Sequence, residues 1–343
     1  MIRSLVFLDV FYGVLPLFFV MLIGYAASYA PKFPPGVEPA LNVFVFYVAL
    51  PALLYKVVAR ADISDGIPRS FLWISVASTL AFAALCWLGF RYLLRVGRAR
   101  ALAGMLSTSF GNVSYLGIPI ILGVMGPQAG FAAGMGQLVH NVIFMLGFPV
   151  LAQILLPSGA GGQHQSSPAR IARTIRNALI QSPVTWAMLA GAVVVLFAVP
   201  VPQPVEDTVD LLSAAAAPGA LFVIGMSLKR TIARSRAKRN TPVDPVGVAG
   251  TVKWAKTSIA VMVLGKLVAL PLLTVAMLLA FAPDLDRIWF NAAVLMAAMP
   301  VSATAYIMAQ NDTGDGEPTA VAIVITCVLS VIALPVIAQL VLK

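Results

Sequence analysis

Ten apolar runs of about 20 residues follow one another along this chain, joined mostly by short connections. A run of that length can cross the hydrocarbon core of a bilayer as a helix. Only 10% of the residues are charged, whereas a soluble domain has roughly 25%. The chain is therefore predicted to be an all-α polytopic membrane protein with spans at 10–30, 39–58, 70–94, 101–125, 129–156, 183–199, 205–228, 257–281, 288–310 and 317–341.

The first 30 residues raise one alternative, a cleaved signal peptide that ends in Ala-Ser-Tyr-Ala. The apolar stretch is too long for a signal peptide, and Asp9 is out of place in one. A first membrane-spanning helix is the preferred interpretation.

The basic residues are distributed unevenly between the connections. If both termini lie outside, sixteen cations fall in cytoplasmic loops and six on the other side, which follows the positive-inside rule. The dense positive segment after Leu228 is interpreted as a cytoplasmic charge anchor, with contact to anionic lipid as the alternative. Because the cations are spread over the loops of one membrane face, the net charge of +10 does not indicate nucleic-acid binding.

Two of the apolar runs carry poor helix formers at their centres. The run 101–125 contains Gly111, Asn112, Gly117 and Pro119, and the run 288–310 contains the segment MPVSATA from Met299 to Ala305. Irregular backbone at membrane depth is tolerated only where protein or a water-filled cavity satisfies its polar groups. We expect spans four and nine to be broken, at Gly111–Pro119 and at Met299–Ala305 around Pro300, and to cross near the midplane. The alternative is that these residues only kink two ordinary helices.

Short motifs recur in the same order in the two halves of the chain. The matched pairs are Pro149–Gln153 with Pro335–Gln339, Pro51 with Pro218, Val113-Ser114 with Val301-Ser302 and, more weakly, Pro16 with Pro183. Five spans per copy is an odd number, so the second copy must insert with the opposite orientation, as in inverted-repeat transporters. The predicted organisation is a first five-helix repeat at 1–156, a cytoplasmic linker at 157–182 and a second, inverted repeat at 183–343.

The chain resembles the auxin efflux carrier family, and within it the bacterial members often called malonate transporters. The resemblance rests on FGNVSYLGIPI in span four, LGKLVALPLL in span eight and MPVSATAYIMAQ in span nine, with further support from Asn42–Pro51 and QSPVTWAMLAG. It implies a scaffold of helices 1, 2, 6 and 7, a transport part of helices 3–5 and 8–10, and an elevator-like motion. It also implies a homodimer through the scaffold, in the plasma membrane. The long cytoplasmic loop of the plant members is short here, so regulation by that loop is not expected.

The polar residues at membrane depth favour an anionic ligand. All thirteen carboxylates lie in loops or at span ends, so no acidic side chain is available to hold a transported cation. We expect the substrate to contact residues that donate hydrogen bonds, carry charge or lie at the breaks: Asn112, Ser114, Tyr115, His140, Asn141, Pro300, Ser302 and Thr304. Lys266 and Gln137 are expected to support this site.

Each of these residues has a structural alternative. Asn112 could satisfy the broken backbone beside it, and His140 could pair with a carbonyl instead of serving a proton-linked role. The small hydroxyl residues could permit close helix approach, and Tyr115 could be a packing group. Lys266 could bond to the carbonyls at the ends of the half-helices instead of contacting the substrate.

The predicted function is secondary transport of a small organic anion, with malonate or another dicarboxylate as the candidate. The main rival is a Na⁺-coupled organic-anion symporter of the bile-acid type, which shares the broken-helix plan. An intramembrane enzyme is disfavoured because the only two histidines, His140 and His164, have no carboxylate partner at depth. A channel is disfavoured because polarity is confined to the two breaks. Neither a cofactor nor a metal is expected.

Overall fold

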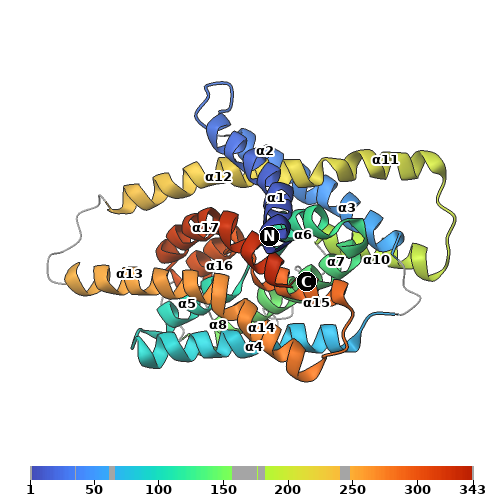
Figure 1. Ribbon diagram of the computed structural model, residues 1–343. Coiled ribbons are helices and arrows are strands. Elements are labelled where there is room, and N and C mark those ends of the chain that lie inside the picture. The colour runs from blue at the N-terminus through green and yellow to red at the C-terminus, as the bar shows by residue number, and fades with distance from the viewer. Residues whose placement is uncertain are drawn as a thin grey trace.

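The regular secondary structure of the first half of the described chain is helical. The computed structural model (Figure 1) describes residues 2–34, 36–61, 66–156, 176, 182–239 and 248–341, and this part contains no β-strand. The helices of the first half are α1 (Ile2–Ala27), α2 (Val37–Phe44), α3 (Leu50–Ala59), α4 (Arg69–Leu88), α5 (Arg98–Ser109), α6 (Ile118–Met125), α7 (Gly130–Asn141) and α8 (Gly147–Leu155). The predicted linker 157–182 lies almost entirely outside the described residues.

The second half continues the same architecture. Its helices are α10 (Pro183–Leu196), α11 (Gln203–Ala214), α12 (Ala216–Arg239), α13 (Val248–Leu264), α14 (Leu270–Phe281), α15 (Arg287–Ala297), α16 (Ala303–Thr313) and α17 (Glu317–Val341). The prediction of an all-helical protein is therefore confirmed for the described residues.

Six continuous helical segments of the described chain are long and apolar enough to cross a membrane. They are Val37–Ala59, Arg69–Leu93, Pro127–Leu155, Gln203–Lys229, Lys256–Phe281 and Pro318–Val341. Shorter apolar helices occupy the other four predicted spans, at Val14–Ala27, Val113–Met125, Pro183–Leu196 and Arg287–Ala297. Two of these four are short because spans four and nine are interrupted.

Several of the long helices contain a π-helical turn. These turns are η1 (Val45–Ala49), η2 (Gly89–Leu93), η3 (Val113–Gly117), η5 (Val142–Leu146) and η7 (Gly265–Ala269), and a short 3₁₀ turn, η4 (Pro127–Ala129), precedes α7. The four π turns other than η2 end two or three residues before a proline: Pro51, Pro119, Pro149 or Pro271. A proline in a helix has no N–H and its ring clashes with the carbonyl four residues earlier. In all four cases that carbonyl lies inside the π turn, whose wider hydrogen-bond pattern accommodates the ring without breaking the helix.

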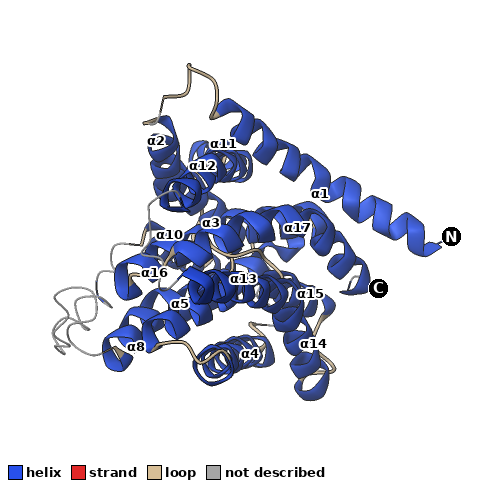
Figure 2. Cartoon of the chain, turned by 90° about the vertical axis from the view of Figure 1, so that its left-hand side faces the viewer, coloured by secondary structure: helices blue, strands red, loops and turns tan. Residues whose placement is uncertain are grey.

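The helices form two groups that are distinguishable in Figure 2. Helices α1, α2, α11 and α12 lie at the top of that view, and α4, α8 and α14 lie at the bottom. Within the upper group α1 packs on α12. Helices α3 and α10, which lie below that group in the view, pack on each other, and α3 also packs on α11. The α1–α12 approach is close enough that a Cβ on Gly24 or Gly225 would meet the backbone of the facing helix. Both chain ends emerge on the same side of the molecule.

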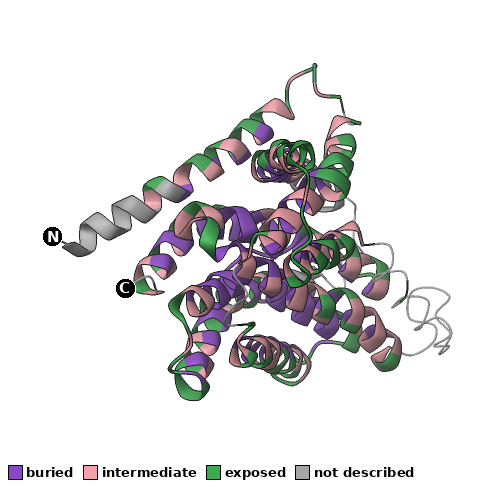
Figure 3. Cartoon of the chain, turned by 90° about the vertical axis from the view of Figure 1, so that its right-hand side faces the viewer, coloured by how far each residue is buried: buried purple, intermediate pink, exposed green. Residues whose placement is uncertain are grey.

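Burial is greatest in the interrupted helices. Figure 3 shows buried residues at the middle of the molecule and exposed ones on the outer helices. Residues 101–113 and residues 291–302 are buried without exception. A helix that is buried on every side must satisfy its end groups internally, because no solvent reaches them.

Candidate functional site

The first interruption lies between α5 and η3. Helix α5 ends at Ser109, and Phe110 is extended, with φ −82° and ψ 103°. Asn112 starts the next helical segment as its N-cap, and its Oδ1 accepts a hydrogen bond from the Tyr115 amide at 3.3 Å. Asparagine is among the preferred N-cap residues because its short side chain reaches the free amides of the first turn. The polar side chain that looks out of place at this depth therefore begins a helix.

The second interruption has the same construction. Helix α15 ends at Ala297, and α16 begins at Ala303. Ser302 is the N-cap, and its Oγ accepts a hydrogen bond from the Thr304 amide at 3.2 Å. Each half of the chain thus contributes one helix that stops and restarts after a polar cap.

The two interruptions pair with each other. Gly111 and Val301 form an isolated antiparallel bridge. The Asn112 amide donates to the Pro300 carbonyl at 2.8 Å, and the Ser302 amide donates to the Phe110 carbonyl at 3.0 Å. Each break therefore supplies the backbone partners that the other break lacks, which is how irregular backbone can persist in a buried position.

Side chains satisfy the two remaining amides of the bridge. The Gly111 amide donates to His140 Nε2 at 3.0 Å, and the Val301 amide donates to Thr326 Oγ1 at 3.1 Å. Thr326 in turn donates its hydroxyl to the Ala322 carbonyl at 2.7 Å. A ring nitrogen that accepts a hydrogen bond carries no proton, so neutral His140 holds its proton on Nδ1.

Lys266 connects the C-terminal ends of the two half-helices. Its Nζ donates to the Ser109 carbonyl at 3.2 Å and to the Ala297 carbonyl at 3.0 Å. These are the last residues of α5 and α15, where the partial negative charge of each helix dipole is concentrated. Lys266 is 0% exposed, and in the described part of the chain no carboxylate lies within 4.0 Å of its Nζ.

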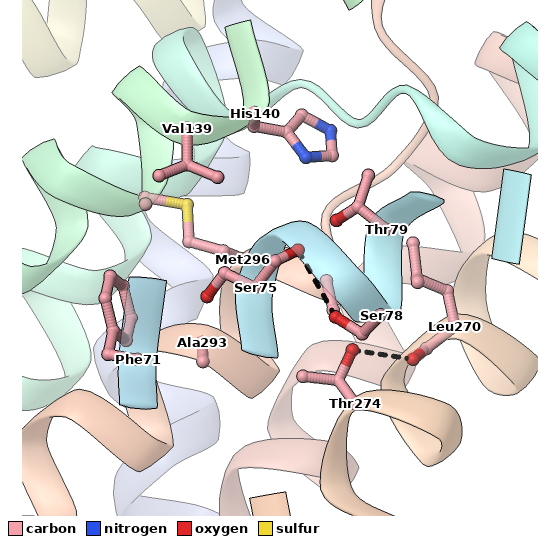
Figure 4. Close-up of a pocket in the computed structure, with 12 residues that line it drawn as sticks. Phe71, Ser75, Ser78, Thr79, Val139, His140, Leu270, Thr274, Ala293 and Met296 are labelled. Atoms are coloured by element: carbon pink, nitrogen blue, oxygen red, sulfur yellow. Dashed lines mark hydrogen bonds between the residues drawn. The ribbon is translucent and has the colours of Figure 1, made fainter. Parts of the chain in front are cut away.

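A small cavity lies directly behind the crossing (Figure 4). Its volume is about 30 Å³, enough for one water molecule. His140 lies on its wall, and one ring nitrogen points toward the side where Ser78 and Thr79 are found. Thr274 also lines it, with its hydroxyl bonded to the Leu270 carbonyl at 2.9 Å. The cavity therefore has room for water beside His140.

The side of the crossing at which η3 and α16 begin is more exposed than the side at which α5 and α15 end. Ser114, Tyr115, Asn141 and Thr304 are all partly exposed there, whereas Asn112 and Ser302 beneath them are buried. Asn141 Nδ2 donates to Ser114 Oγ at 3.4 Å. These side chains and the two capped helix starts can offer hydrogen-bond donors to a ligand, although their roles toward a substrate stay predictions.

Several sequence-based details of the site require correction or addition. Gly117 and Pro119 were expected at the break but lie within helix, in η3 and α6; the break itself is only Phe110–Asn112. Pro119 sits in the first turn of α6, and the π turn before it absorbs its ring. In the second break, Ala303–Ala305 is likewise helical. Gln137 is buried, and its Oε1 has no hydrogen-bond partner among the described residues.

The expected correspondence between the two breaks is displaced by two residues. Val113-Ser114 was matched with Val301-Ser302, but the bridge pairs Gly111 with Val301 and makes Asn112 the counterpart of Ser302. The correspondence predicted from sequence rested on identical residue types. The correspondence in the structure is determined by backbone pairing and N-cap chemistry. Asparagine and serine are different residue types that perform the same N-cap role.

Sequence reasoning also missed two residues of the crossing. Thr326 could have been found, because it lies nine residues before Pro335 just as His140 lies nine residues before Pro149. Asn42 of α2 accepts a hydrogen bond from the Tyr115 hydroxyl at 2.9 Å, which links the upper helix group to the crossing. No local pattern in the sequence indicated that contact.

The geometry defines a class: a helical membrane protein built around two interrupted helices that cross in its interior. Comparison with known proteins gives the family. The family model described as "Membrane transport protein" matches residues 9–338, and the chain belongs to this family, the auxin efflux carrier family.

Individual relatives agree with this assignment. The chain is 28% identical to a Rhizobium meliloti (strain 1021) protein named "Putative malonate transporter" over 318 residues, 93% of this chain and 91% of that protein. It is 24% identical over 331 residues to an "Uncharacterized transporter" of Methanothermobacter thermautotrophicus, covering 94% and 95% of the two chains. It is also 24% identical to the "Uncharacterized transporter YfdV" of Escherichia coli (strain K12) over 225 residues, 62% of this chain and 67% of that one. The chain is thus a membrane transporter by family.

Proposed function

We propose that this protein is a secondary transporter that moves a small organic anion, with a dicarboxylate such as malonate as the first candidate. The observation that carries the proposal is the charge distribution at the crossing. Four half-helix ends meet there, and each carries about half an elementary charge. Lys266 is bonded to both negative ends. The two positive ends have only the neutral caps Asn112 and Ser302, with no acidic residue in either first turn.

The positive ends are suited to a carboxylate. The helical segments that begin at Asn112 and Ser302 carry the positive end of a helix dipole in their first turns, and helix N-termini commonly bind anions. Partly exposed donors surround them, among them Ser114 and Asn141. The choice of a dicarboxylate draws on the name of the Rhizobium relative.

The transport mechanism proposed here is elevator-like alternating access by two inverted five-helix repeats. The matched breaks, the antiparallel bridge between them and the matching side-chain partners His140 and Thr326 support the repeat. The packing of α1 on α12 and of α3 on α10 and α11 supports a scaffold, against which the other helices would move. The proposal also includes a homodimer formed through that scaffold. Both chain termini would lie outside the cell, and the protein would be located in the plasma membrane.

The test is uptake into proteoliposomes by the purified protein, with a panel of mono- and dicarboxylates. Asn112→Ala should weaken binding of the transported anion by roughly 1–3 kcal/mol, since it removes a buried polar group at the positive ends. The matched control is Asn291→Ala, which removes another buried amide of a broken helix about 9 Å from its break. Uptake that is equal in the two variants would remove Asn112 from the site, and no uptake of any carboxylate by the wild type would refute the proposed function.

A further inference from the structure

Lys266 places an ammonium group against two backbone carbonyls at the crossing. Its two acceptors are backbone carbonyls from helices that are far apart in sequence, α5 and α15, brought together only at the crossing. Carbonyl oxygens from unwound or terminating helices are the groups that coordinate small cations in transporters of this architecture. In this chain the ammonium group of a side chain lies between them.

The charge of the Lys266 ammonium group matches that of the two helix C-termini in magnitude. Two helix C-termini together carry about one negative charge, which one ammonium group neutralises. No carboxylate of the described chain competes for that ammonium within 4.0 Å. The site is therefore electrically complete with Lys266 in it, and a second cation at the same carbonyls would be repelled.

Two glycines make room for this arrangement. A Cβ on Gly111 would lie 2.7 Å from Lys266 Nζ and 2.8 Å from its Cε, so the ammonium rests directly against the crossing backbone. A Cβ on Gly265 would collide with Thr108 of α5, so that glycine lets the helix bearing Lys266 approach α5 closely. The same helix contains η7, the π turn in which Lys266 itself lies.

We propose that Lys266 is a built-in counter-ion that takes the place of a transported sodium ion, so that this carrier moves its anion without sodium. The part of this inference that concerns transport rests on the proposed function. The part that concerns the cation site at the Ser109 and Ala297 carbonyls does not rest on it, and measurements of protein stability alone can test that part.

The experiment compares the wild type with Lys266→Ala, which removes the ammonium and leaves space beside the two carbonyls. The thermal midpoint of unfolding in detergent is measured in choline buffer alone, and again with NaCl or methylammonium chloride added. Lys229→Ala is the matched control, because Lys229 also donates to a backbone carbonyl, Ser28 O at 2.6 Å, but at a partly exposed position. Uptake of the best substrate of the carboxylate panel is measured under the same conditions.

We expect the wild type to be indifferent to sodium in both measurements. Lys266→Ala should lower uptake about tenfold or more, the loss that a buried charged hydrogen-bonding group implies. Methylammonium, which carries three N–H donors on a small cation, should raise the midpoint of Lys266→Ala and restore uptake several-fold. Tetramethylammonium, which has no N–H donor, should do neither, and Lys229→Ala should respond to none of these ions.

Specific results would overturn the inference. Sodium-dependent uptake by the wild type would show that a coupling cation binds in addition to Lys266. A Lys266→Ala protein that is stabilised by no small cation, or equally by tetramethylammonium, would show that the carbonyl pair is not a cation site. If Lys266→Ala cannot be purified, Lys266→Met keeps most of the side-chain volume; uptake by that variant at the wild-type rate would overturn the role. Absence of all wild-type uptake refutes the proposed function instead and leaves the stability arm valid.

Discussion

Replacing Gly111 by alanine adds one methyl group where the crossing backbone touches Lys266. That Cβ would lie 2.7 Å from Nζ, 2.8 Å from Cε and 3.2 Å from the Met299 carbonyl oxygen. Gly111 is not among the glycines with positive φ, which in the described chain are Gly66, Gly126 and Gly314. Alanine therefore fits the backbone conformation, and the expected effect is a steric one on Lys266.

The size of the destabilisation follows from the contacts that Lys266 would lose. Overpacking a filled interior costs about 1–3 kcal/mol. Displacing the ammonium from one carbonyl costs part of a charged hydrogen bond, itself about 1.5–3 kcal/mol. Because the end of a lysine side chain is flexible, it can either stay in place and be overpacked or move and lose a hydrogen bond. The two free-energy costs are therefore not added together. We expect Gly111→Ala to lower the free energy of unfolding by about 1–3 kcal/mol.

A double-mutant cycle isolates this contact. With Lys266→Ala in the background, the two closest of these contacts are gone and the Met299 carbonyl oxygen at 3.2 Å remains, so Gly111→Ala should cost much less there. The coupling free energy between the two substitutions should reach about 0.5–3 kcal/mol. The assay is unfolding in mixed detergent micelles titrated with SDS and followed by tryptophan fluorescence.

Gly147→Ala serves as the control for the cycle, because a Cβ at Gly147 in α8 would meet nothing within 4 Å. Alanine is the better helix former, so this variant should be neutral or slightly stabilised. If Gly111→Ala costs the same in both backgrounds, the ammonium does not rest against Gly111 and the geometry of the Lys266 site is wrong.

Three further predictions concern hydrogen bonds of the crossing, all measured by the same unfolding titration. His140→Ala leaves the buried Gly111 amide without its acceptor and should cost about 1–3 kcal/mol, whereas His140→Gln keeps an acceptor and should cost less; equal costs would contradict the bond. Ser302→Ala removes the N-cap of α16 and should cost about 0.5–2 kcal/mol, with Ser302→Asn recovering most of it; no recovery would mean the cap is unimportant. Tyr115→Phe should cost about 0.5–1.5 kcal/mol through the lost bond to Asn42, and adding Asn42→Ala should cost little more; full additivity would exclude that bond.

Sequence alone could predict the helices but not the register of the crossing. Apolar length identified the helical ranges, because burial in lipid demands continuous apolar segments. The break of span four was predicted to extend to Pro119 because proline and glycine disfavour a regular α-helix. The actual break is shorter, since a π turn accommodates the proline. Such turns depend on packing around the helix and leave no simple mark in residue order.

The candidate site was predictable to a different extent for each residue. Asn112 and Ser302 stood out because polar groups at membrane depth are unusual. Bonding to the broken backbone was one of the two interpretations of Asn112, whereas the N-cap role of Ser302 was not foreseen, since its alternative was close helix approach. Lys266 stood out as a buried cation, and bonding to helix-end carbonyls was one of its two interpretations. Which two carbonyls it contacts could not be known, because Ser109 and Ala297 meet only in three dimensions.

The π turn η7 has a consequence for the angular phase of its helix. From α13 into α14 every fourth residue is buried: Ser258, Met262, Lys266, Leu270, Thr274 and Leu278. On a regular α-helix, at 3.6 residues per turn, a step of four residues advances about 40°, so five steps would carry the last residue about 200° round the axis. One extra residue accommodated in the π turn takes back about 100° of that rotation. A helical wheel drawn straight through this span would therefore assign the wrong face to its second half. Deleting one residue from η7 should rotate Thr274 and Leu278 away from the protein interior while Ser258 and Met262 keep their places.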